Sequence, residues 1–301
     1  MENNQRLIEQ LKNAGFRAAL LPFSYMKQIL QVFDTYIDNS DKTQFNIKDW
    51  VLAHQPPKIA FTPLSFLVIA FRSSAGEICL NHKGKEISIP IPPTYLDDSI
   101  KTRLADTLKP IQQDYQLAKT EGVPLKMLAV LSGLGKYGRN ALCYMDDFGS
   151  YCNFEAYYTD IVCEDEKHSF EIMDDCDSCG LCIESCPTGA LGGEQIIDTT
   201  HCLTMLNESD APMPDWLSPS VHHALVGCMR CQEICPVNKQ ISLHKKETLS
   251  LSLCETEAFL SVKSEDSEIG MKLSKYGIWP SFVCLAGRNA KYAVDAKERE
   301  L

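Results

Sequence analysis

The chain has 301 residues, of which 45% are hydrophobic, 9% aromatic and 23% charged. This composition excludes a disordered chain, and at about 150 residues per domain the length predicts two domains. The 29 Lys and Arg against 40 Asp and Glu leave a net charge of −11, which argues against non-specific binding to nucleic acid. Residues 160–200 alone hold eleven acidic residues and one lysine, a net of −10.

The sequence contains no segment typical of membrane insertion or secretion. Its longest apolar stretch, Pro63 to Phe71, is shorter than the ~20 residues of a membrane span, and its polar start lacks the layout of a signal peptide. Fourteen cysteines in such a chain indicate metal ligands rather than disulfides. We therefore expect a cytoplasmic protein that makes no membrane contact.

The first half of the chain alternates between helical and strand patterns. Apolar residues at helical spacing predict two helices between Gln5 and about Asn39, separated by Pro22. Branched and apolar residues predict strands, or a hairpin, over Ile59 to Phe71 and Glu77 to Pro90, with a turn at residues 81–84. A helix from about Asp97 to Ala118, laid on the sheet, follows.

Beyond this helix the pattern centres on a glycine-rich turn. Pro124 to Gly133 reads as a helix, the turn runs from Gly133 to Asn140, and two strand-like runs flank Asp146 to Gly149. After the cysteine-rich segment, a helix is expected near Ser281 to Ala293.

The strongest signal is a pair of cysteine motifs. The first is C-x-x-C-x-x-C-x-x-x-C-P, and the second is C-x-x-C-x-x-x-C-P. This is the spacing of bacterial two-cluster ferredoxins, in which the cysteine before Pro binds the other cluster. By that rule one [4Fe–4S] cluster takes Cys176, Cys179, Cys182 and Cys235.

The second cluster takes Cys186, Cys228 and Cys231, and lacks one ligand. Cys202 is the best candidate to complete it, since it lies between the motifs on a short helical run. Structural zinc is the alternative, although zinc sites rarely need the Cys-Pro ending twice. The six cysteines without ligand spacing are expected to be small buried hydrophobes: Cys79, Cys143, Cys152, Cys163, Cys254 and Cys284.

These motifs define a fold class and three segments. We expect an α+β protein with a mixed α/β domain over residues 1–164 and a ferredoxin-like domain with two [4Fe–4S] clusters over residues 165–240. Residues 241–301 are expected to form a helical tail that packs on the core. Three histidines lie near the motifs: His201, His222 and His223. We expect them to have surface or capping roles rather than to adjust the cluster potentials or transfer protons.

The residues around the second motif carry a family resemblance. The run from Gly227 to Asn238, GCMRCQEICPVN, resembles the second cluster motif of the epoxyqueuosine reductase family, and Cys182 to Ala190 resembles the first. The turn GLGKYGRN at residues 133–140, with Gly149-Ser150 after it, is similar to the segment that precedes the clusters in that family. Arg288-Asn289-Ala290 extends the match near the end of the chain.

This resemblance implies a cobalamin-dependent iron–sulfur reductase. Members of the family bind a corrinoid on an α/β domain beside two cubanes and remove an epoxide oxygen from a modified tRNA nucleoside, and a related architecture carries reductive dehalogenation. It implies that the corrinoid would be bound by Gly133, Gly135, Gly138, Asn140, Gly149 and Ser150. It also implies a low-potential electron donor of the ferredoxin or flavodoxin type.

Three departures from the family pattern bear on the substrate. Glu121 stands where the family has the Asp of a Val-Asp-x-x-Pro segment, and so becomes the candidate proton donor. The Asp-Tyr-His of the family has no clear counterpart near residues 95–98, and we expect a shortened member without the helical-repeat extension. The substrate is therefore expected to be a small molecule or a modified nucleoside, with whole tRNA bound weakly or not at all.

Two other functions compete with this one. Gly133-x-Gly135-x-x-Gly138 fits a dinucleotide fingerprint, with Glu155 as the ribose-binding acid, but a helix precedes it and a strand follows, the reverse of that motif's context. The second alternative is an electron-transfer protein whose two clusters reduce a corrinoid or flavin on a partner protein. Acidic residues 160–200 would then dock a basic donor, or form a solvated surface that lowers the cluster potentials.

Overall fold

In the computed structural model the described residues are 2–31, 59–93, 98–163, 169–192, 197–261 and 267–299. They form two compact units that interleave along the chain. Unit 1 comprises residues 1–72, 102–180 and 193–199, and unit 2 comprises residues 73–101, 181–192 and 200–301. The two units do not begin and end at residues 164 and 240, where the sequence analysis placed the domain boundaries. Those boundaries stay a prediction.

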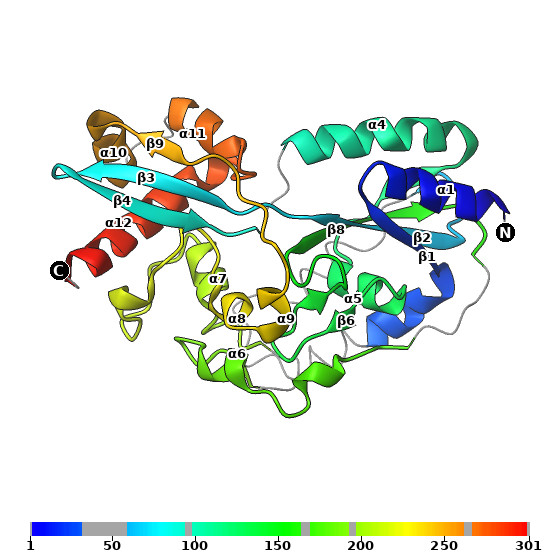
Figure 1. Cartoon of the computed structure of the whole chain (residues 1–301). Coiled ribbons are helices and arrows are strands. Elements are labelled where there is room, and N and C mark those ends of the chain that lie inside the picture. The colour runs from blue at the N-terminus through cyan, green and yellow to red at the C-terminus, as the bar shows by residue number, and fades with distance from the viewer. Residues whose placement is uncertain are drawn as a thin grey trace. The chain divides into compact units, whose positions relative to one another are not determined.

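Unit 1 is built on a four-stranded antiparallel sheet of order β1-β2-β8-β5 (Figure 1). Its central strands are long and apolar, and every residue of β2 except the last is buried. The strands are β1 (Arg17–Pro22), β2 (Ser65–Arg72), β5 (Leu117–Lys119) and β8 (Cys152–Thr159).

Alternation along β2 gives this sheet two buried faces. Phe66 and Val68 pack on α5 (Leu125–Leu131), whose five central and C-terminal residues are buried. Helices α1 (Glu2–Asn13) and α4 (Asp98–Asp114) lie over the other face (Figure 1). The short hairpin of β6 (Lys136–Tyr137) and β7 (Cys143–Tyr144) and the 3-10 turns η1 (Phe23–Tyr25) and η3 (Asp174–Cys176) complete the unit.

Unit 2 is a three-stranded sheet covered by helices. The hairpin of β3 (Gly76–His82) and β4 (Lys85–Ile91) turns at Lys83 and Gly84, both with positive φ, as a two-residue hairpin loop requires. β9 (Leu249–Leu251) adds a parallel strand beside β3. Apolar residues of the hairpin pack on α10 (Leu253–Leu260), α11 (Ser267–Ser274) and α12 (Val283–Arg299).

The cysteine motifs of unit 2 fold into short helical segments that follow one another without a sheet of their own. These are α6 (Leu181–Glu184), α7 (Leu203–Asn207), α8 (Arg230–Glu233), α9 (Pro236–Lys239) and the 3-10 turn η4 (Pro219–Val221). A further 3-10 turn, η5 (Pro280–Phe282), precedes α12. No helix in the described ranges is long and apolar enough to cross a bilayer.

The hairpin, the helix after Pro124 and the C-terminal helix are confirmed, and the fold class with them. The strand expected over Ile59 to Phe71 is confirmed from Ser65, where β2 begins, and the residues before it are not strand. The expectation of two helices from Gln5 to Asn39 is wrong for residues 17–22, which form the strand β1. Gly15, with φ of 89°, ends α1, and the amide of Phe16 donates to Leu11 O as in a helix-terminating motif. The helix expected to reach Ala118 ends at Asp114, since Leu117–Lys119 pairs with β8. Residues 32–58 of the first prediction lie outside the described residues.

Candidate functional site

The C-terminal parts of the two cysteine motifs fold alike within unit 2. Cys182 is the second residue of α6 and Cys231 the second residue of α8, and these two helices pack against each other. Each helix is followed by a Cys-Pro step, at Cys186 and at Cys235, and Cys235 begins α9 with Pro236 in its first turn. Proline suits that position because its nitrogen has no proton to donate. The repeated motif therefore gives two matching ligand loops.

Three of the four cysteines predicted for the second cluster come together in unit 2. Burial raises the pKa of Cys228 to about 12, and the adjacent thiols of Cys202 and Cys186 contribute to that rise. Burial also raises the pKa of Cys202, and Cys186 adds to it. Bound iron would keep these thiols deprotonated, as a metal does with its cysteine ligands. The donor set thus fits a [4Fe–4S] cluster.

A single zinc ion fits this site less well. Zinc needs its donors around one point, and within the described residues no group of three His, Cys, Asp or Glu could hold one ion. In a cubane each cysteine binds a different iron, so the four sulfurs need no common centre. Cys202 lies at the N-cap of α7, close to the predicted position on a helical run.

His223 contacts one of the cysteines predicted for the second cluster. Its Nε2 lies 3.7 Å from Sγ of Cys228 and accepts a hydrogen bond from the Met229 amide at 3.4 Å, while Nδ1 faces Val221 O at 3.0 Å. His222 is buried and stacks on Tyr292 with ring centroids 4.7 Å apart. His201 packs on Trp216 at 4.7 Å. Of the three histidines, His223 is therefore the one that the structure places against a predicted ligand.

Residues close in sequence to two of the predicted ligands line an open cavity of about 450 Å³ in unit 2. Its wall includes Ser185 and Pro187, which flank Cys186, and Arg230 and Glu233, which flank Cys231. The four residues are partly or fully exposed. Solvent and small solutes thus reach the residues next to two of the cluster ligands.

The first cluster's cysteines divide between the two units. Cys176 and Cys179 belong to unit 1, and Cys182 and Cys235 to unit 2, so their common cluster stays a prediction from spacing. Within unit 1, the amide of Arg139 donates to Sγ of Cys176 at 3.4 Å, and its guanidinium donates to Asp177 O at 3.2 Å. Arg139 is part of the glycine-rich turn, which therefore touches the first cysteine of the motif.

A short strand-like pairing strengthens this link. Tyr137 exchanges backbone hydrogen bonds with Glu171 and Met173, and its ring stacks on Phe170 with centroids 4.9 Å apart. Lys136 pairs with Glu171 at 3.1 Å, which raises the pKa of Lys136 through that hydrogen bond and charge. The segment that leads to Cys176 is thus fixed along β6.

Packing within unit 1 explains why two residues of the turn are glycines. A Cβ on Gly135 would lie 2.5 Å from Tyr144 O, and one on Gly138 would lie 2.5 Å from the Tyr144 ring. Asn140 is buried, and its Nδ2 donates to Tyr144 Oη at 2.9 Å. These three residues thus hold the turn against β7, which is a structural role independent of any cofactor.

The predicted corrinoid residues lie in consecutive turns of unit 1, with unequal exposure. Gly133 is exposed and Gly135 half-buried, while Gly138, Asn140, Gly149 and Ser150 are buried. Gly149 closes the second turn through hydrogen bonds with Met145 in both directions. A corrinoid fits the described residues in part, since only the backbone near Gly133 and Gly135 offers it surface.

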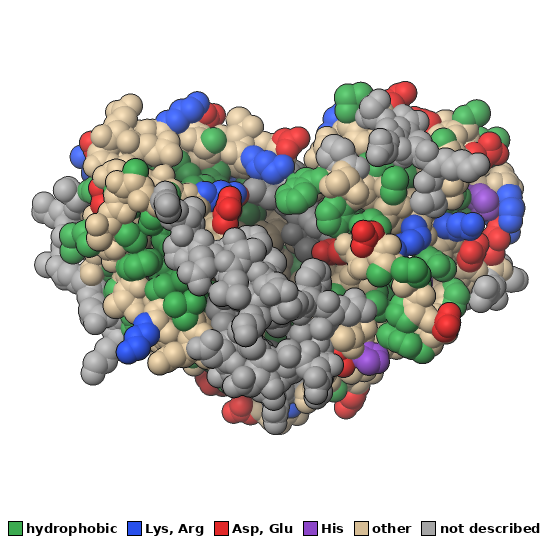
Figure 2. Space-filling view, turned by 180° about the vertical axis from the view of Figure 1, so that it is seen from behind, with side chains coloured by type: hydrophobic (Ala, Val, Ile, Leu, Met, Phe, Trp, Pro, Cys, Tyr) green, Lys and Arg blue, Asp and Glu red, His purple; other side chains and the backbone are tan. Residues whose placement is uncertain are grey.

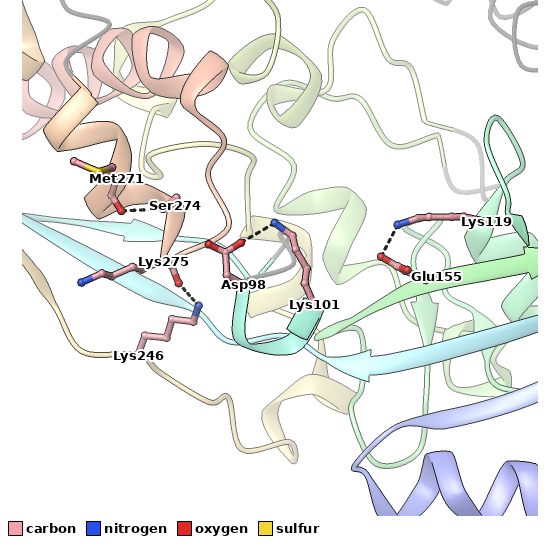
Figure 3. A network of polar contacts seen from close by, with 8 residues as sticks. All are labelled: Asp98, Lys101, Lys119, Glu155, Lys246, Met271, Ser274 and Lys275. Carbon is pink, nitrogen blue, oxygen red and sulfur yellow. Dashed lines mark hydrogen bonds and ion pairs between the residues drawn. The ribbon is translucent and has the colours of Figure 1, made fainter. Parts of the chain in front are cut away.

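Glu121 lies in the loop between β5 and α5 and is exposed. It therefore does not occupy the apolar pocket that would make a carboxylic acid a proton donor at neutral pH. The buried carboxylate of this region is Glu155, which accepts a hydrogen bond from Lys119 at 2.7 Å (Figure 3). It accepts a second hydrogen bond from Tyr157, also at 2.7 Å. Glu155 already binds these two partners. The glycine-rich turn of residues 133–140 follows the helix α5 and enters the strand β6, the reverse of a dinucleotide-binding motif. Both observations disfavour a dinucleotide site.

The six cysteines without ligand spacing differ in burial. Cys143 is buried and Cys79, Cys152, Cys163 and Cys284 are half-buried, whereas Cys254 is exposed on α10. The expectation of a buried hydrophobe is wrong for Cys254, because the second position of this helix faces solvent.

The comparisons with known proteins agree with the cysteine code. Residues 175–238 match the 4Fe-4S double cluster binding domain. Epoxyqueuosine reductase of Bacillus subtilis is 29% identical over 144 residues, 47% of this chain and 36% of that protein. That of Bacillus cereus is 32% identical over 115 residues, 38% of this chain and 29% of that protein. The aligned segments span about a third of the length of these curated relatives.

Solved structures extend the likeness in fold to nearly the whole chain. Epoxyqueuosine reductase from Bacillus subtilis superposes with a TM-score of 0.69 at 19% identity, covering 98% of this chain and 82% of that chain. The enzyme from Streptococcus thermophilus gives 0.67 at 17% identity, covering 99% and 82%. A structure with a tRNA-Tyr epoxyqueuosine-modified tRNA stem loop gives 0.68 at 20%, covering 98% and 81%. The cluster region of the protein is thus similar in sequence to epoxyqueuosine reductases, and the chain shares their fold.

Proposed function

We propose that the chain is a cobalamin-dependent iron–sulfur reductase that removes the oxygen of an epoxide in a modified nucleoside. The reaction consumes two electrons and two protons, breaks both carbon–oxygen bonds, and yields an alkene and water. The observation that carries this proposal is the gathering of Cys186, Cys202 and Cys228 inside a double-cluster segment of this family.

Electrons would enter one at a time at the second cluster, from a ferredoxin or flavodoxin type of donor. The cavity beside Cys186 and Cys231 supports this entry side, because it brings solvent-accessible surface next to two ligands. The first cluster, at Cys176, Cys179, Cys182 and Cys235, would receive them next. The hydrogen bond from the Arg139 amide to Cys176 stabilises negative charge on that sulfur and so favours the reduced cluster.

The exposed backbone near Gly133 and Gly135 would hold the cobalamin. When bound, cobalamin would supply a strongly reducing metal for the reduction of the epoxide. The chain's own task is to keep water away from that metal and to deliver protons. Glu121 is the proposed donor of one proton on the family pattern alone, and bound cofactor and substrate would have to shield its exposed carboxyl from water.

The substrate is proposed to be the modified nucleoside or a small oligonucleotide. The net charge of −11 opposes the many phosphates of a folded tRNA. On the face seen in Figure 2, Lys and Arg side chains are scattered and mixed with Asp and Glu rather than gathered. The relative solved with a modified tRNA stem loop makes tRNA the second candidate substrate.

Anaerobic purification followed by iron and sulfide analysis tests the cluster assignment, with about eight of each expected per chain. Cobalamin titration under reducing conditions, followed by calorimetry and absorption spectra, tests the cofactor. Intact clusters without cobalamin binding would favour the alternative of an electron-transfer protein that reduces a corrinoid or flavin on a partner. Loss of epoxide from an epoxyqueuosine substrate, with a low-potential donor, tests the reaction.

A further inference from the structure

The Arg288-Asn289 pair on α12 contacts the far end of the helix that begins at Cys202. Nη1 of Arg288 donates to Ser209 O at 2.8 Å and Ala211 O at 3.1 Å. Its Nη2 donates to Leu206 O at 3.1 Å and Asn207 O at 3.3 Å. One guanidinium therefore binds four backbone carbonyls where the helical hydrogen bonding of α7 ends.

Asn289 extends this contact to a second segment. Its Nδ2 donates to Asn207 O at 2.9 Å and to Leu225 O at 3.1 Å, and its Oδ1 accepts from Nε of Arg288 at 3.2 Å. Asn207 in turn donates from Nδ2 to Gly227 O at 2.8 Å. Asn207 and Asn289 are fully buried. Such a buried network holds its members in one arrangement, because breaking any bond leaves a buried polar group unpaired.

Both segments held in this way end at predicted cluster ligands. Cys202 is the N-cap of α7, a helix of five residues and thus about 7.5 Å long. Cys228 follows Gly227 directly in the chain. The buried contacts of Asn207 and Asn289 therefore lie within one short helix of Cys202 and next to Cys228 in the chain.

We propose that Arg288 and Asn289 are positioning residues of the second [4Fe–4S] cluster, which hold Cys202 and Cys228 at cluster-binding separation. The inference rests on the proposed function, because the cluster itself belongs to that proposal. Residues behind the ligands commonly control metal affinity and potential in this way. It gives the Arg288-Asn289-Ala290 motif a role that its sequence alone does not show.

The charge of Arg288 adds an electrostatic effect. Among the described residues Arg288 forms no ion pair with a carboxylate within 4 Å, and its hydrogen bonds go to carbonyl oxygens of the backbone and of Asn289. The partly buried charge is thus screened less than a surface charge. A reduced cluster carries one more negative charge than an oxidised one, so a nearby cation favours reduction. The potential of the second cluster is therefore a second readout for Arg288, whose nearby charged groups also include Asp210.

The test compares Arg288→Met, Arg288→Lys and Asn289→Ala with the wild-type holoprotein. Iron content, EPR spectra of the reduced protein and the reduction potential of each cluster are measured. Arg288→Met should lose the second cluster selectively or lower its potential, with the first cluster unchanged. Arg288→Lys keeps the charge but not the planar fork, so its potential should stay closer to wild type while the cluster becomes labile. Asn289→Ala should make the second cluster labile.

Lys291→Met is the matched control, since Lys291 is exposed on the same helix and the change removes the same charge. It should leave both clusters as in the wild type. The inference is overturned if Arg288→Met and Asn289→Ala both keep the iron content and spectra of the wild type. It is also overturned if Arg288→Lys and Asn289→Ala lose both clusters equally, because equal loss indicates general unfolding. A wild-type protein with fewer than two clusters would instead contradict the proposed function, and the inference with it.

Discussion

The backbone amide of Arg139 donates a hydrogen bond to Sγ of Cys176, at 3.4 Å. It joins the glycine-rich turn to the first cysteine of the ferredoxin-like motif, two features that the sequence places 37 residues apart. The turn is thereby part of the surroundings of the first cluster, whatever else it binds. Hydrogen bonds to cluster sulfurs are one of the main controls of reduction potential.

Replacement of Arg139 by Pro should lower the reduction potential of the first cluster. Proline has no amide proton, so Cys176 loses its donor and the reduced cluster is destabilised. Arg139→Ala is the control, because it removes the guanidinium but keeps the amide. Potentiometric titration followed by EPR measures the effect. A potential that shifts equally in both variants would show that the side chain, rather than the amide, acts on the cluster.

Cys202→Ser should lower the iron content from about eight to about four atoms per chain, because a cubane with three cysteines is readily lost. Cys254→Ser is the control, since Cys254 is exposed and has no ligand spacing, and it should keep full iron content. Iron and sulfide analysis with reduced-state EPR measures the outcome. Unaltered iron and spectra in Cys202→Ser would mean that another residue completes the second cluster.

Gly135→Ala should destabilise the fold by about 1–3 kcal/mol, the usual cost of overpacking, since its Cβ would lie 2.5 Å from a backbone oxygen. Gly192→Ala should be nearly neutral, because nothing lies within 4 Å of a Cβ there. Thermal unfolding measured by circular dichroism compares the two. If Gly135→Ala unfolds like the wild type yet no longer binds cobalamin, the glycine serves the cofactor rather than the turn.

His222 should make stability depend on pH. Burial, with help from Arg288 and His223, lowers its pKa from 6.5 to about 4, so the folded protein favours the neutral ring. As the pH falls, the His222 ring is protonated in the unfolded chain at a higher pH than in the folded protein. The free energy of unfolding is therefore highest above pH 6.5 and decreases by up to about 3 kcal/mol as the pH falls toward 4. His222→Phe, which keeps a ring to stack on Tyr292, should flatten this loss. Unfolding temperatures at pH 7, 6 and 5 measure it, and equal slopes in the two proteins would contradict the assignment.

The sequence predicted local features better than distant ones. The double-cluster domain was predicted from cysteine spacing, because a cubane requires closely spaced ligands along the chain, while the assignment of each cysteine to a cluster stays a prediction. The strand β1 was mistaken for a helix, because Phe16 and Leu20 fit a helical period and only the pairing of Leu20 with Leu67 makes the segment a strand. Arg139 and Arg288 were not assigned roles, since their partners lie 37 and about 80 residues away.

Turnover of an epoxyqueuosine-containing tRNA should be slower than turnover of the corresponding nucleoside. A folded RNA is held by several Lys and Arg that neutralise phosphates, and its affinity falls with salt for each such contact. This chain carries −11 overall, and its last 61 residues carry nine charges of each sign. Several of its cations are also engaged within the protein: Lys119 pairs with Glu155, and Nζ of Lys246 donates to Lys275 O at 2.6 Å (Figure 3). The assay supplies each substrate with cobalamin and a low-potential donor at two salt concentrations. Conversion of tRNA at rates near ~1 s⁻¹, with a strong loss at high salt, would contradict this prediction and identify tRNA as the substrate.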